Sequence, residues 1–159
     1  MKAAVALVAA LCLSACGSLA NSTSGGGDSP SPDPKSAAYV ALVKSVYTSY
    51  NTARGDAYDE CVVAVDPPSC HDRGAAMVAV WEQFLKDLDA TPAPPQFTRD
   101  DRMIRTNLPL AIGALKTMVA AAERNDGGEV VQAANAYIND MQPSVIAALG
   151  DVYAPWRTN

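Results

Sequence analysis

Residues 98–124, TRDDRMIRTNLPLAIGALKTMVAAAER, decide the fold that the sequence predicts. Apolar residues recur there every three or four positions, the spacing that places side chains on one face of an α-helix. Thr98 and Asp101 have the spacing of a capping box, so we expect a helix over residues 99–124. Pro109 is expected to kink this helix, because proline lacks the backbone N–H. The apolar stripe consists of Ile104, Leu108, Ala111, Leu115, Met118 and Ala122.

Two stretches before this segment have the same period. The first predicts a helix from about Ser36 through Gly55 to Val65, ended by Asp66-Pro67-Pro68. Its stripe is Tyr39, Val43, Val46, Tyr50, Ala53 and Ala57. Ser69 and Asp72 form a second capping-box pattern and predict a helix to about Leu88. The apolar side of that helix is Val78, Trp81, Leu85 and Leu88.

A fourth helix is predicted after the break at residues 125–128. Asp126 and Glu129 give its cap, Pro143 is expected to kink or divide it, and Gly150 is expected to end it in a left-handed conformation. Its apolar residues are Val130, Ala134, Tyr137, Ile138, Met141, Val145, Ile146 and Leu149. No segment alternates with a period of two, so no sheet is expected. The sequence predicts an all-α domain over 36–159, an antiparallel four-helix bundle with kinked third and fourth helices.

The N-terminal sixteen residues have a different character. Lys2 precedes the apolar run Ala3–Leu13, which is too short to span a bilayer and is typical of a signal-peptide core. Leu13-Ser14-Ala15-Cys16 follows and resembles the lipobox of bacterial lipoprotein precursors. The resemblance implies that residues 1–15 are removed and that Cys16 carries lipid. It also implies anchoring to the cell membrane, on the extracytoplasmic face. The alternative is an ordinary secretory signal with Cys16 incidental.

Residues 16–35 are predicted to be a disordered linker, because Leu19 is the one large apolar residue among Gly, Ser and Pro. The whole chain of 159 residues has a formal charge of −5. That sign argues against a nucleic-acid partner, which requires a basic surface.

Cys61 and Cys70 remain as a pair once Cys12 and Cys16 are assigned to the signal and the lipid. In an oxidising compartment they are predicted to form a disulfide between the first two helices. A metal site is the alternative, because Asp59, Glu60, His71 and Asp72 are close in sequence. The spacing is not that of a zinc motif, so we expect no metal and no cofactor.

No catalytic motif is present, and His71 is the single histidine. We therefore expect a non-enzymatic binding module whose partner is an envelope protein or a small ligand held in the core. The alternatives are an envelope hydrolase or wall-remodelling accessory with carboxylates from different helices, and a structural spacer. Candidate binding residues are Arg99, Arg102 and Arg105, which recur every third position, and Trp156 near the C-terminus. The arginines have a second interpretation, as partners of neighbouring acids, and Trp156 has one as a cap of the bundle end. Six aromatic residues are also enough to line a pocket: Tyr39, Tyr47, Tyr50, Tyr58, Trp81 and Tyr137. Tyr39, Tyr50 and Tyr137 lie in the apolar stripes, so we expect core packing rather than a pocket.

Overall fold

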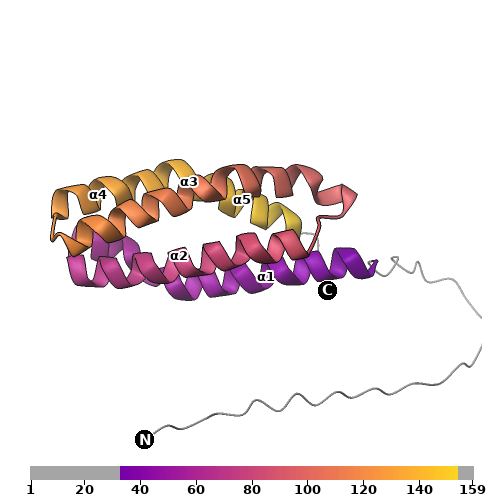
Figure 1. Cartoon of the computed structure of the whole chain (residues 1–159), viewed down its shortest axis with the longest axis horizontal. Coiled ribbons are helices and arrows are strands. Elements are labelled where there is room, and N and C mark those ends of the chain that lie inside the picture. Colours follow the sequence, from indigo (N-terminus) through magenta and orange to yellow (C-terminus); the bar gives the residue numbers. More distant parts are fainter. Residues whose placement is uncertain (1–32, 154–159) are drawn as a thin grey trace, which may run out of the picture. The chain divides into compact units, whose positions relative to one another are not determined.

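The computed structural model describes residues 33–153, and every regular element within them is a helix (Figure 1). The all-α prediction is therefore confirmed for this part of the chain. The elements are α1 (Pro34–Arg54), the π-helix η1 (Asp59–Val63), α2 (Pro67–Ala90), the 3₁₀ helix η2 (Pro95–Phe97), α3 (Thr98–Glu123), α4 (Gly127–Asn135), the π-helix η3 (Ala136–Met141) and α5 (Gln142–Tyr153). The predicted signal peptide, and the predicted linker up to residue 32, lie outside the described residues.

The helices pack around one core. α1 lies beside α2, α3 packs on α2, and α4 and α5 pack on α3 (Figure 1). α5 also contacts α1, so the helices enclose the apolar side chains between them. Full burial of one large apolar side chain contributes about 1.5–3 kcal/mol. The largest fully buried side chains include Trp81, Tyr39, Tyr50, Phe84, Met77 and Leu88.

The predicted stripes account for most of this core. All six stripe residues of α3 are buried, as are those predicted for the first helix except Ala53, which is half-buried. The buried face of α2 is displaced from the prediction. Met77 and Phe84 are buried, whereas Val78 and Leu85 are half-buried at the edge. On a helix, two neighbouring rows of side chains can both have a spacing of three and four residues. The periodicity alone therefore does not show which of the two rows is buried.

Two predicted helix caps are wrong. Ser69 lies inside α2, and its hydroxyl donates to the Asp66 carboxylate at 2.5 Å. α2 begins earlier because Pro67 suits the first turn, where its missing N–H has no intrahelical role. Thr98 is the first residue of α3 and donates to the Pro95 carbonyl oxygen at 2.9 Å. The Asp126 cap is confirmed, since its carboxylate accepts from the Glu129 N–H at 3.0 Å.

Two predicted helix ends are also wrong. The first helix stops at Arg54, because Gly55 has φ 45° and leaves the helical region. Gly150 lies inside α5, which continues to Tyr153 and buries Val152 and Tyr153. α3 extends through Pro109 as a single α-helix.

Candidate functional site

The chain between α1 and α2 forms the first wall of a cavity. Gly55 has φ 45°, a conformation that L side chains rarely adopt, so glycine is favoured at this turn, and the Arg73 guanidinium lies against it. Arg73 in turn pairs with Glu60, at 3.0 Å between Nε and Oε2. These contacts fix the position of η1 against α2. The residues that face the cavity from this wall are Arg54, Ala57, Tyr58 and Cys61.

The second wall of the cavity is formed by the π-helix η3 and by the residues that flank it, between α4 and α5. Over Ala136–Met141 the backbone adopts the wider π-helical pattern, and the Gln142 N–H donates to the Tyr137 carbonyl. Single π-helical turns within α-helices occur frequently at functional sites. The residues that this run contributes to the cavity are Ala134, Tyr137, Ile138 and Gln142.

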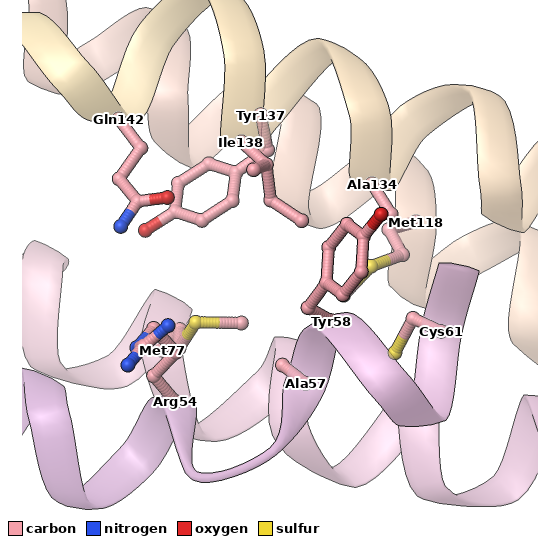
Figure 2. Close-up of a pocket in the computed structure, with 10 residues that line it drawn as sticks. All are labelled: Arg54, Ala57, Tyr58, Cys61, Met77, Met118, Ala134, Tyr137, Ile138 and Gln142. Carbon is pink, nitrogen blue, oxygen red and sulfur yellow. The ribbon is translucent and has the colours of Figure 1, made fainter. Parts of the chain in front are cut away.

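Met77 of α2 and Met118 of α3 complete the cavity, which has a volume of about 160 Å³ (Figure 2). Both methionines are buried, and methionine adapts to irregular apolar space. Arg54 and Tyr58 are the exposed residues of the described lining and mark where the cavity approaches the surface. No carboxylate lines the cavity among the residues that the structure describes.

Most polar groups of the cavity lie toward one end, and the Tyr58 hydroxyl lies at the other. In Figure 2 the Tyr137 hydroxyl lies near the Gln142 amide, and the Arg54 guanidinium lies across the open space on the same side of the cavity, away from Met118 and Cys61. The Trp81 Nε1–H donates to the Tyr137 oxygen at 3.2 Å, which fixes the orientation of the ring. Burial and the neighbouring Tyr50 hydroxyl raise the pKa of Tyr137, so its hydroxyl stays protonated.

Tyr50 lies behind this polar end. Its ring stacks on Trp81 at 4.6 Å between centroids, and burial raises the pKa of its hydroxyl. The hydroxyl is buried without a hydrogen-bond partner of good geometry among the described residues. The Tyr137 hydroxyl and the Gln142 amide nevertheless lie near enough to lower its pKa in part. A buried hydroxyl with no well-formed partner is uncommon in proteins.

Cys61 and Cys70 form a disulfide in the structure, with their Cα atoms 5.3 Å apart. The bond joins η1 to α2, and Cys61 is also part of the cavity wall. The described residues contain no group of three or more His, Cys, Asp and Glu side chains that would hold a metal ion. His71 contacts Asp72 at 3.0 Å and Glu123 at 3.6 Å, and the hydrogen bond to Asp72 raises its pKa.

The three candidate arginines of α3 differ in their surroundings. Arg105 pairs with Asp101 at 2.8 Å and with Asp89 at 2.6 Å, and it donates to the Leu88 carbonyl at 2.8 Å. Arg99 and Arg102 are exposed, with no ion pair to another described residue. None of the three lines the cavity.

Cys16 and Trp156 lie outside the described residues. Between residues 33 and 153, none of the helices has the length and apolarity that crossing a bilayer requires.

The sequence pattern missed Arg54, Met77 and Gln142 as site residues. The cavity results from the break at Gly55 and from two π-helical segments, and hydrophobic periodicity encodes neither. One signal was available, because Tyr58 and Tyr137 belong to the aromatic set that the sequence offers for a pocket.

Compared with models of protein families, with curated proteins and with solved structures, the chain matches none of them.

Proposed function

We propose that this protein is a non-enzymatic binding module of the cell envelope that holds a small, largely apolar molecule in the cavity. The observation that carries the proposal is a space of about 160 Å³ walled by methionine, tyrosine, isoleucine and alanine side chains. Binding sites for small molecules are concave and mostly apolar, with a few polar groups that orient the ligand. The cavity has both properties.

The volume limits the ligand. A dry apolar cavity of about 150 Å³ in another protein accepts benzene, whereas sites for drug-sized molecules measure roughly 300–1,000 Å³. The cavity here, at about 160 Å³, therefore suits one six-membered ring or an aliphatic group of similar size. This size argues against an envelope polymer or a whole lipid as its occupant.

A second candidate function is hydrolysis by carboxylates from different helices. Asp100 of α3 supports it, because partial burial and Asp151 of α5 raise the pKa of Asp100. Neither acid lines the cavity, and Arg99 beside Asp100 opposes the shift. A hydrolytic role requires that Asp100→Asn abolish turnover of a wall substrate without unfolding the protein. Binding in the cavity is the better supported function, because the lining lacks a carboxylate.

The finer arrangement of the chain is part of the proposal. We infer an antiparallel four-helix bundle in which α4, η3 and α5 act as one helix, with bends at Pro109 and near Pro143. The short links and the contacts between neighbouring helices support it. An experimental structure with neighbouring helices parallel, or with straight third and fourth helices, would contradict it. We further propose that lipid on Cys16 holds this domain at the membrane, as the lipobox-like residues imply.

Toluene is a suitable probe for the cavity. Added to the full chain in detergent, it should shift the methyl NMR signals of Met77 and Met118 in a saturable manner, because both side chains line the cavity. Signals of the protein itself separate this binding from partition into micelles. If neither methyl responds, the proposed binding function is wrong.

A cavity-filling variant provides the matched comparison. Ala134→Leu places a larger side chain in the space and should abolish the toluene response, whereas Ala147→Leu on the exposed face of α5 should retain it. Thermal unfolding of both variants checks that they fold. Equal toluene responses in the two variants would place the binding elsewhere.

A further inference from the structure

The charge at the polar end of the cavity indicates the chemical class of the ligand. Arg54 is the only cation of the described lining, and it has no ion-pair partner among the residues that the structure describes. Other cations of the same region are paired: Arg73 with Glu60, Arg124 with Glu129 and Lys116 with Glu82. A guanidinium binds carboxylates well, because its planar N–H groups match the two carboxylate oxygens.

The neutral groups beside Arg54 add hydrogen-bond donors. The Tyr137 oxygen already accepts from Trp81, so the Tyr137 hydroxyl has a proton left to donate. The Tyr50 hydroxyl is buried beside Tyr137 without a well-formed partner, and Tyr50 is not part of the cavity lining. If the Tyr137 hydroxyl donates to Tyr50, the Gln142 amide remains as a neutral donor at this end of the lining. The polar end therefore offers more donors than acceptors, together with a positive charge.

The opposite end carries no charge, and its polar group in Figure 2 is the Tyr58 hydroxyl, which lies beside Met118. Figure 2 places the Met118 sulfur, Cys61 and Ala134 there, with the Met77 methyl and Ile138 between the two ends. A ligand aligned with this polarity has an apolar body against the sulfur atoms and an anionic head near Arg54. The volume of about 160 Å³ permits a body of about one ring.

We propose that the cavity binds a small monocarboxylate, with its ring or short aliphatic body between Met77 and Met118 and its carboxylate at Arg54, Tyr137 and Gln142. This inference rests on the proposed binding function and adds the charge and the orientation of the ligand. A carboxylate is ionised at neutral pH, since its usual pKa is about 4. Because of the interaction with Arg54, the cavity should bind a carboxylate more tightly than a neutral molecule of the same shape.

Benzoate and benzamide test this distinction, because they share a ring and differ in charge. In the full chain, benzoate should bind about tenfold more tightly than benzamide, as expected for a hydrogen-bonded charge near the surface. The preference should decrease as salt is added, because Arg54 is exposed. The methyl signals of Met77 and Met118 again report the binding.

Three variants test whether Arg54 causes the preference for benzoate over benzamide. Arg54→Gln should reduce benzoate affinity about tenfold and leave benzamide affinity within twofold, and Arg54→Lys should restore part of the loss. Arg99→Gln is the matched control, because it removes an exposed arginine that does not line the cavity. It should change neither affinity. Thermal midpoints of all three variants verify folding.

The outcomes separate this inference from the proposed function. If toluene binds but benzoate is not preferred over benzamide, the cavity is a binding site for neutral molecules and the carboxylate proposal is overturned. Equal losses in Arg54→Gln and Arg99→Gln would also overturn it, because they would indicate general surface charge. If toluene, benzamide and benzoate all leave both methyl signals unchanged, the proposed function itself is wrong.

Discussion

At the scale of single residues, Cys61 belongs to two features at once. It forms the disulfide with Cys70, and it lines the cavity beside Tyr58. The bond joins η1, which no regular α-helical ladder supports, to the first turns of α2. The disulfide therefore stabilises the wall of the cavity as well as the connection between two helices.

Opening this bond should lower the free energy of unfolding by about 2–3 kcal/mol, because the loop of 9 residues gains chain entropy in the unfolded state. The measurement is denaturant unfolding of the Cys61→Ser/Cys70→Ser variant against the native chain. Helix content by circular dichroism should stay the same. Before reduction, Cys61 and Cys70 should resist thiol labelling; rapid labelling of both in the native, unreduced protein would contradict the disulfide.

At the scale of elements, α2 and α3 approach closely at Gly74. A Cβ atom there would lie 2.7 Å from the Met118 Cε and 2.7 Å from the Val119 Cγ2. Met118 is long and can move, but Val119 is branched next to the backbone and is stiff. The absence of a side chain at Gly74 thus sets the separation of the two helices next to the cavity.

Gly74→Ala should lower stability by about 1–2 kcal/mol, since crowding between α2 and α3 outweighs the gain in helix propensity. Gly113→Ala is the matched control, because a Cβ atom on Gly113 meets nothing within 4 Å. That change in α3 should raise stability by about 0.5–1 kcal/mol. Thermal and denaturant unfolding of both variants measure the difference, and a Gly74→Ala protein as stable as Gly113→Ala would mean that the helices are not in contact there.

The elements also explain how far the sequence predicts this structure. The stripe from Ile104 to Ala122 predicts α3 correctly, because burial of one face requires a regular period. The cap at Asp126 is also predicted correctly, because its carboxylate accepts a hydrogen bond from the N–H of Glu129, only three residues later in the sequence. The π-helical segments are not predicted, because their hydrogen bonds depend on packing of distant elements rather than on local pattern. Gln142, which follows η3, and Arg54, which precedes the break at Gly55, were missed for this reason.

At the scale of the whole molecule, the net charge opposes the membrane attachment that we propose. Without residues 1–15 the chain loses one base, Lys2, and keeps 11 basic against 17 acidic residues, a net charge of −6. An acidic domain is repelled by an anionic membrane surface. The proposed attachment to the membrane therefore relies on the lipid on Cys16, and two acyl chains are enough for a stable anchor.

Cys16→Ser should therefore release the protein from membranes or leave it unprocessed, because serine provides no thiol for the lipid. Fractionation of cells that express the variant measures the release, and mass spectrometry of the mature N-terminus of the native protein measures the modification. An unmodified N-terminus at another residue would contradict the lipid anchor.

The π-helical segment η3 has a consequence for how the cavity is gained or lost in evolution. Its hydrogen bonds span one residue more than those of an α-helix, so the segment accommodates one extra residue within an otherwise regular run. Deletion of a single residue within Ala136–Met141 should therefore return this run to α-helix while α4 and α5 keep their packing register. The loss of one codon should thus reshape the wall that Tyr137 and Ile138 form, and one insertion should restore it.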